Sequence, residues 1–141
     1  MQVKRTVKRM ISKFYKAEGQ TKEKRKMERL QLFYRYSDAV PVQMVPGIVR
    51  KTLVSSDRLM ICRFDLETGA EIPAHAHPQD QIGYVVSGRV RITVAGKSFD
   101  LEAGDTYSAP SGVEHKALTL EKAVVVDTFS PPRDDYRMEQ K

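Results

Sequence analysis

The sequence has few of the residue types that cross-link a protein or anchor it in a membrane. Only one of its 141 residues is cysteine, Cys62, so no disulfide can form within the chain. It has no apolar run of the ~18 or more residues that a transmembrane helix needs. It also has no positively charged start followed by an apolar segment, the pattern of a secretory signal. These absences predict a cytoplasmic protein in which Cys62 is a small apolar residue within a strand.

Histidine is also scarce, and the three histidines fall into one spaced pattern. Residues two apart on an extended strand point to the same side, so His75 and His77 can face one interior ion. Gln81 follows near the start of the next expected strand, and His115 comes from a distant one. The whole pattern is Gly69-x5-His75-x-His77-x3-Gln81-x6-Gly88, then Gly104-x5-Pro110-x-Gly112-x2-His115.

This pattern predicts one divalent transition metal, held by three imidazole nitrogens and one amide oxygen. Such ligands suit Zn, Ni, Mn, Fe or Co and do not distinguish among them. In an alternative arrangement Gln81 only hydrogen-bonds a ligand histidine, and three imidazoles hold the ion.

Charge is distributed unevenly along the chain. Residues 1–36 contain 12 Lys/Arg and 3 Asp/Glu, a balance of +9, whereas residues 37–141 contain 12 and 15, a balance of −3. Apolar residues spaced by three and four predict a helix over residues 3–14, and residues 22–33 are also compatible with a helix. We therefore expect a basic amphipathic helical arm at 1–36 and a separate domain at 37–141.

The arm allows more than one interpretation. A basic amphipathic helix suits a nucleic acid or an anionic membrane surface as partner. Alternatively, its apolar stripe packs on the domain or on a partner subunit, while its charges stay in water. A third alternative is that the native chain starts near Met27.

After Pro41 the sequence has the pattern of an all-β domain. Short alternating segments are separated by turn residues roughly every eight to twelve positions, which predicts an antiparallel sandwich or barrel. The segment 47–54 could pair as an edge strand across two subunits, so we expect a homodimer. The expected strands are 47–54, 59–65, 81–87, 89–95, 98–101, 106–109, 116–120 and 123–129.

The spaced histidine and glycine pattern resembles the two motifs of the cupin family, over about residues 40–132. The resemblance implies a small double-stranded β-helix, or jelly-roll, barrel with its metal at His75, His77, Gln81 and His115. The usual motifs have Glu where this chain has Gln81, and Asn where it has Thr119. An uncharged ligand leaves the ion its full +2 charge, which favours anionic ligands and Lewis-acid or binding roles over oxygenase chemistry.

The C-terminal strand places a carboxylate among apolar residues. Asp127 shares a face with Phe129, and if this face lines the interior, the carboxylate needs a partner or a use. It either forms a structural bridge with an arginine or acts as a general base, its pKa raised by apolar surroundings. Pro131 and Pro132 could hold Arg133 over the mouth of the barrel. There its guanidinium could bind a substrate carboxylate through two parallel hydrogen bonds.

Together with the metal pattern, this tail resembles the cupins of pectin and alginate breakdown that open the ring of 4,5-unsaturated uronates. The resemblance implies that Asp127 is catalytic and that Phe129 and Arg133 bind the substrate. It predicts ring opening and tautomerisation of such a uronate, or of a similar small carbohydrate acid bound through its carboxylate. Two alternatives remain: a non-catalytic cupin that binds or senses a small anion through its metal, and a dioxygenase.

Overall fold

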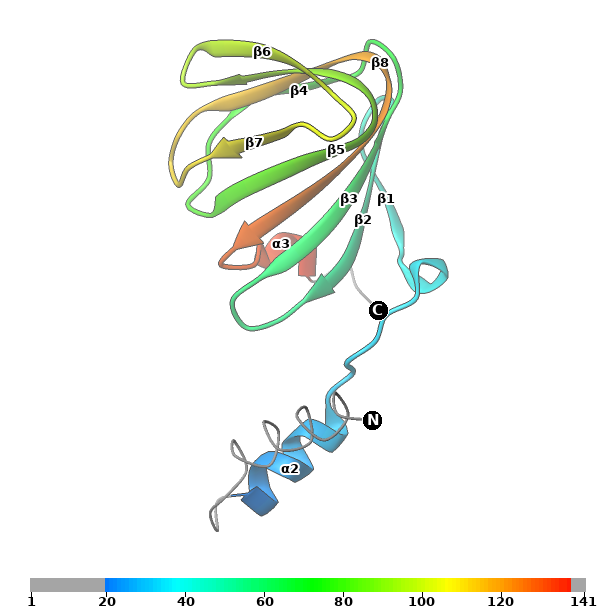
Figure 1. Ribbon diagram of the computed structural model, residues 1–141, viewed down its shortest axis with the longest axis vertical. Coiled ribbons are helices and arrows are strands. Elements are labelled where there is room, and N and C mark those ends of the chain that lie inside the picture. Colours follow the sequence, from blue (N-terminus) through cyan, green and yellow to red (C-terminus); the bar gives the residue numbers. More distant parts are fainter. Residues whose placement is uncertain (1–19, 138–141) are drawn as a thin grey trace, which may run out of the picture. The chain divides into compact units, whose positions relative to one another are not determined.

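The computed structural model describes residues 20–137 and divides into two compact units, of which the second starts at Tyr34 (Figure 1). The first unit contains α2 (Gln20–Arg29), whose side chains from 22 to 28 are exposed and mostly charged. α2 lies in the part of the arm that was compatible with a helix. The helix expected over 3–14 lies outside the described residues. None of the described helices is long and apolar enough to cross a membrane.

The second unit is an antiparallel β-roll with a short helical segment near each end. Its elements are η1 (Tyr36–Asp38), β1 (Pro41–Val45), β2 (Ile48–Ser55), β3 (Met60–Leu66), β4 (Glu71–His75), β5 (Asp80–Val94), β6 (Lys97–Glu102), β7 (Thr106–Ala109), β8 (His115–Ser130) and α3 (Asp134–Arg137).

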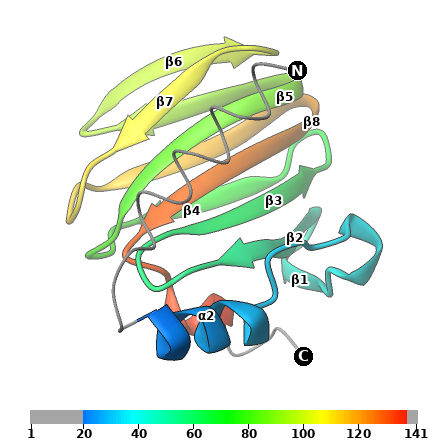
Figure 2. The ribbon, with the colours of Figure 1, turned by 60° about the horizontal axis from the view of Figure 1, so that its bottom comes forward.

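Two long strands organise the roll. The sheet order is β1-β2-β3-β8-β5-β6, with β4 added beside β8 and β7 beside β5. The first half of β5 lies between β7 and the end of β8, while its second half lies between β6 and the start of β8. Each long strand therefore contributes to both halves of the curled sheet (Figure 2). This arrangement confirms the predicted all-β jelly roll.

The sequence predicted a break within each of these long segments, and this was wrong. Segments 81–87 and 89–95 form the single strand β5, and segments 116–120 and 123–129 form the single strand β8. Register shifts between Val85 and Val90 bend β5 where a break was expected. Gly88 lies at this bend, with φ +79° and no room for a Cβ against the backbone of Lys122 and Ala123. A bulge bends and twists a strand without ending it, so a glycine here resembles a turn in the sequence.

The interior is built by strict alternation along the strands. In β3 the side chains of Met60, Cys62, Phe64 and Leu66 are buried, and those between them are only half-buried. Cys62 is a buried strand residue, as expected. The same alternation in β8 turns Asp127 and Phe129 inward. The face that packs the core therefore also carries the carboxylate.

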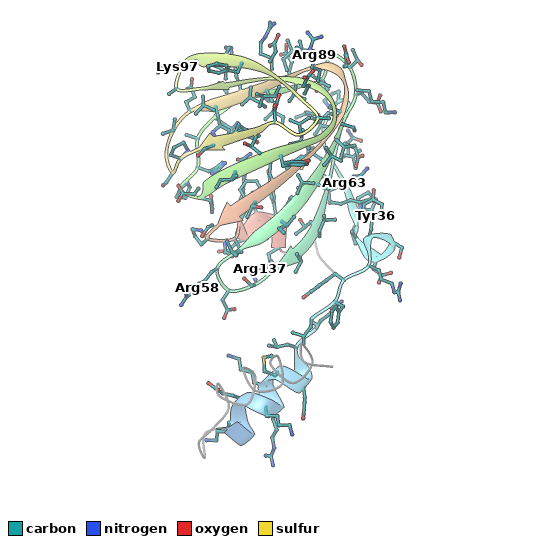
Figure 3. The ribbon with its side chains drawn as sticks, viewed as in Figure 1. Tyr36, Arg58, Arg63, Arg89, Lys97 and Arg137 are labelled. Carbon is teal, nitrogen blue, oxygen red and sulfur yellow. The ribbon has the colours of Figure 1, made fainter. Side chains whose placement is uncertain are left out.

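The expected edge strand is covered by β1 over its first half. β2 pairs with β3 from Ile48 to Ser55, and on its other side it pairs with β1 over residues 48–51. The segment before β1 is held against this sheet by its aromatic ring: Tyr36 lies under Lys51, 4.1 Å from ring centroid to Nζ, and near Arg63 (Figure 3). The first half of β2 therefore has no free edge for pairing with a second subunit.

Candidate active site

The three histidines converge at one end of the roll. His75 is the last residue of β4, and it pairs directly with His115, the first residue of β8. One ligand atom from each of His75, His77 and His115 lies within 4.8 Å of the others. The expectation that His75 and His77 share one extended strand is only half met, because β4 ends at His75 and His77 follows it. Their ring centroids nevertheless lie 5.6 Å apart.

Backbone carbonyl groups fix the tautomer of all three rings. Each Nδ1 lies 2.8–3.0 Å from the carbonyl oxygen of a residue two positions away along the chain. A carbonyl oxygen can only accept, so each Nδ1 carries the proton and each Nε2 keeps its lone pair. Metal-binding histidines are commonly oriented in this way. The three carbonyls belong to Pro73, Gln79 and Val113.

The Nε2 atoms are available to bind a cation. Nε2 of His115 is buried and has no hydrogen-bond partner among the described residues. Nε2 of His77 lies 3.0 Å from Oε1 of Gln81, so two lone pairs face each other unless a positive charge lies beside them. Burial lowers the pKa of both His77 and His115, which favours the neutral imidazoles that bind metals. The donor set therefore suits a divalent transition metal.

Asp127 lies directly behind Gln81. Its Oδ2 accepts a hydrogen bond from Nε2 of Gln81 at 2.9 Å, and its Oδ1 accepts one from the Tyr107 hydroxyl at 2.8 Å. These partners replace the arginine that was one of the two expected alternatives. Burial raises the pKa of Asp127 to about 7, an effect larger than the lowering by its two hydrogen bonds. A carboxyl group with this pKa can both take up and release a proton near neutral pH.

Tyr107 was missed by the sequence analysis. It lies on β7 opposite Gly83 of β5, where a Cβ would overlap the Tyr107 ring and come within 2.6 Å of Oδ1 of Asp127. Burial raises the pKa of the Tyr107 hydroxyl well above its usual value, so it remains protonated. The signal that could have identified it is the glycine inside a strand, which indicates a close approach by another group.

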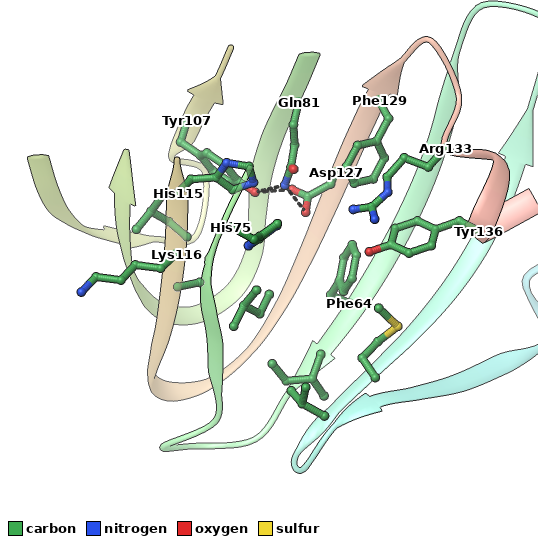
Figure 4. A pocket seen from close by; sticks show the side chains of 16 residues that line it. Phe64, His75, Gln81, Tyr107, His115, Lys116, Asp127, Phe129, Arg133 and Tyr136 are labelled. Carbon is green, nitrogen blue, oxygen red and sulfur yellow. Dashed lines mark hydrogen bonds between the residues drawn. The ribbon is translucent and has the colours of Figure 1, made fainter. Parts of the chain in front are cut away.

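A pocket joins the histidine cluster to the C-terminal segment (Figure 4). Its cavity volume is about 100 Å³, and it is open to solvent on one side. His75, Gln81 and Asp127 line its polar side, and Phe64 and Phe129 form apolar walls. Phe129 also lies beside the histidine cluster, with its ring centroid 5.8 Å from that of His77. The pocket thus combines polar groups on one side with aromatic walls, as sites for small polar ligands do.

Arg133 lines the same pocket. Its guanidinium stacks on the ring of Tyr136 at 4.0 Å and lies 5.8 Å from the ring of Phe129. It also donates two hydrogen bonds to the Asp135 carboxylate, at 2.9 and 3.3 Å. The side chain is therefore held in place but not enclosed, with 18% of its surface exposed. Tyr136 was a second residue that the sequence analysis missed, since it lies on the short helix α3.

Comparison with known proteins agrees with this geometry. Residues 62–129 match the Cupin domain family. Pectin degradation protein KdgF from Dickeya dadantii is 36% identical over 106 residues, which are 73% of this chain and 96% of the relative. The structure of KdgF from Halomonas sp. aligns with a TM-score of 0.71 at 35% identity, over 75% of this chain and 98% of the other. An RmlC-like cupin from Shewanella frigidimarina gives 0.72 at 32% identity, over 76% and 96%.

Proposed function

Because this chain belongs to the cupin family, we propose that it is a metal-dependent enzyme of pectin degradation that opens the ring of 4,5-unsaturated uronates. The observation that carries the proposal is the placement of Asp127, a buried carboxylate, in one pocket with the histidine cluster and Arg133. A uronate offers the matching groups: a carboxylate, an apolar ring face and ring oxygens. The similarity to proteins named for pectin degradation supports the same substrate class.

We assign the metal to His75, His77 and His115, with Gln81 as fourth ligand. A divalent ion bound there would supply Lewis acidity to a substrate oxygen. Arg133 would bind the uronate carboxylate, since its guanidinium faces the pocket and is already oriented by Asp135. Phe129 would pack against the sugar face. These contacts would place the anomeric end of the ring near Asp127.

The reaction needs one proton to move between two substrate atoms. Asp127 takes the proton of the anomeric hydroxyl, the bond from the anomeric carbon to the ring oxygen breaks, and an aldehyde forms. The electron pair left on the ring oxygen forms a ketone as the 4,5-double bond is lost, and carbon 4 takes up a proton. The product is the open-chain keto isomer, and no atom is gained or lost. A carboxyl group whose pKa is about 7 is suited to both proton transfers.

The test is the loss of the alkene absorbance of the unsaturated monomer on addition of metal-loaded protein. Asp127→Ala should lower kcat by roughly 10²–10⁴-fold, the contribution typical of a general acid–base group. An Asp127→Ala protein as active as wild type would exclude this mechanism. Elemental analysis of the purified protein identifies the ion, and loading with iron while following oxygen uptake tests for dioxygenase chemistry.

A second candidate is a non-catalytic cupin that binds a small anion while its arm contacts a nucleic acid or an anionic membrane. The exposed, basic helix α2 favours it. Deleting residues 1–33 separates the two candidates. Unchanged uronate turnover supports the enzyme, and lost binding to DNA or anionic vesicles, without any turnover in the full chain, supports the binder.

We further propose that the protein acts in the cytoplasm and as a homodimer. The single cysteine suits a reducing compartment, and its burial in β3 keeps it from pairing between chains.

A further inference from the structure

Gln81, Tyr107 and Asp127 form a closed triangle of hydrogen bonds. The Gln81 amide nitrogen donates to the Tyr107 hydroxyl oxygen at 2.7 Å and to Asp127 at 2.9 Å. The Tyr107 hydroxyl donates to the other Asp127 oxygen at 2.8 Å. The three sides of the triangle need three hydrogen atoms, two from the amide and one from the hydroxyl. Every hydrogen atom of these donors is therefore used within the triangle.

This triangle determines which way the Gln81 amide faces. With both N–H bonds directed at Tyr107 and Asp127, Oε1 must point the other way, and it lies 3.0 Å from Nε2 of His77. If the amide were turned over, its oxygen would face two acceptors, the Asp127 carboxylate and the Tyr107 oxygen whose proton is already donated. The network therefore presents an oxygen, rather than an N–H group, to the histidine cluster.

We propose that Tyr107 is a positioning residue which, with Asp127, orients Gln81 toward the metal, and that position 81 is an amide because position 127 is a carboxylate. The proposal rests on the metal site assigned above. Gly83 supports it, because a side chain at this position of β5 would overlap the Tyr107 ring. When Asp127 is ionised, its negative charge lies one hydrogen bond away from Gln81.

A glutamate at position 81 would remove two of the three hydrogen atoms and place two carboxylates about 2.9 Å apart, at the present distance between the Gln81 nitrogen and Oδ2 of Asp127. Changing Asp127 to asparagine as well restores one donor, because its amide can donate to the glutamate carboxylate. The Tyr107 hydroxyl can then donate to that carboxylate too. In the double variant two sides of the triangle keep a hydrogen bond, whereas in Gln81→Glu alone only one side does.

The first test is a double-mutant cycle on the metal-free, full-length protein, with Gln81→Glu, Asp127→Asn and both together. We expect Gln81→Glu alone to lower Tm by about 10 °C, and by half as much or less when Asp127→Asn is present. If Gln81→Glu lowers Tm by the same amount with and without Asp127→Asn, the proposal is overturned. If the single variant fails to fold while the double variant folds, the proposal is supported.

The second test is Tyr107→Phe, which decides the matter even if neither protein that carries Gln81→Glu folds. It keeps the ring and removes one donor and one acceptor. We expect metal-free Tm to fall by about 5 °C. We also expect the visible spectrum of the Co²⁺-loaded protein to change, because the Gln81 amide is then oriented by Asp127 alone. Tyr34→Phe, at an exposed tyrosine, is the matched control and should change neither.

A Tyr107→Phe protein with the wild-type Co²⁺ spectrum and the Tm of the control would contradict the positioning role. Neither measurement uses the substrate. Failure of the uronate assay with an intact cycle would therefore reject the proposed activity alone, and failure of the cycle with an active enzyme would reject the triangle alone.

Discussion

Gly83 is the residue at which β5 makes room for its neighbours. An alanine there would place its Cβ into the Tyr107 ring and 2.6 Å from Oδ1 of Asp127. Because both groups are hydrogen-bonded and Asp127 is also buried, neither can move aside without breaking the network around Gln81. We expect Gly83→Ala to lower the free energy of unfolding by about 3 kcal/mol, as overpacking does, measured by urea denaturation.

A second glycine provides the control for that substitution. Gly69 has φ +83° and nothing within 4 Å of the position of a Cβ, so Gly69→Ala costs only the left-handed backbone, about 1 kcal/mol. If the two alanine variants lose the same stability, steric crowding at Gly83 is not the reason for the glycine.

Cys62 illustrates how burial alone controls reactivity. The side chain is fully buried, and burial raises the pKa of the thiol to about 11 from its usual 9.0. A shift of this size lowers the thiolate fraction at neutral pH by about 100-fold, so alkylation of the native protein should be at least that much slower than that of free cysteine. Rapid modification by iodoacetamide at pH 7.5 in native buffer, without urea, would contradict this.

The same shift has a consequence for stability at alkaline pH. The folded state holds the thiol proton more tightly than the unfolded chain does. The contribution of the Cys62 thiol to the free energy of unfolding is therefore fully present below pH 9. It is lost as the pH rises from 9 toward 11. The variant Cys62→Ala should lack this part of the alkaline loss, which urea denaturation at pH 8 and pH 10 can measure.

At the scale of elements, α3 supports Arg133, the arginine that we propose binds the substrate. This four-residue helix carries Tyr136, whose ring has the Arg133 guanidinium at 4.0 Å and the buried Arg50 guanidinium at 3.7 Å. Replacing the ring by Tyr136→Leu removes a cation–π contact of about 1 kcal/mol from each guanidinium. Arg133 is then less well held, so we expect KM for the uronate to rise by roughly 5- to 10-fold while kcat changes little.

The control for that experiment keeps the ring. Tyr136→Phe retains the stacking face and should leave KM within about twofold of wild type. A Tyr136→Leu enzyme with an unchanged KM would mean that Arg133 is held by Asp135 alone, or that it does not bind the substrate.

The elements themselves could be predicted from alternation to different degrees. Where the period of two is clear, as in β3 and β7, the expected strands lie within a residue of the observed ones. The continuity of β5 and β8 could not be predicted, because a bulge at Gly88 and a turn have the same local sequence signals. The cover over the first half of β2 could not be predicted for another reason, since β1 was not expected as a strand.

The candidate site was predicted from the sequence to the extent that its ligands follow a spaced pattern. His75, His77 and His115 converge as expected, and Asp127 and Phe129 share the inward face of β8. Tyr107 could not be predicted, since its contact with Asp127 depends on the register between β5 and β7, which pairs it with Gly83. The sequence signal for this contact was Gly83, a glycine within a strand that has an ordinary backbone conformation.

At the scale of the whole molecule, the outer face of the roll carries an exposed apolar strip on β5. Ile82, Tyr84 and Val86 alternate along the strand with their side chains outward, and their exposed fractions are 59%, 48% and 47%. Adjacent β8 adds the half-buried Val124 and Val126, which pair with β5 in this region. Contiguous apolar surface of this kind is typical of interaction sites. Because β1 covers the first half of β2, we expect the homodimer contact at this strip instead.

A pair of charged substitutions tests this contact. In a two-fold interface each substituted residue meets a copy of the same patch, so Ile82→Arg with Val86→Arg places four like charges at the contact. Light scattering should give about 32 kDa for wild type, twice the 16.1 kDa chain, and about 16 kDa for the variant. Phe99→Arg, on β6 and 66% exposed, is the control and should remain a dimer. A wild-type mass of one chain at tens of micromolar would reject the dimer. A variant that stays at two chains would move the contact to another face.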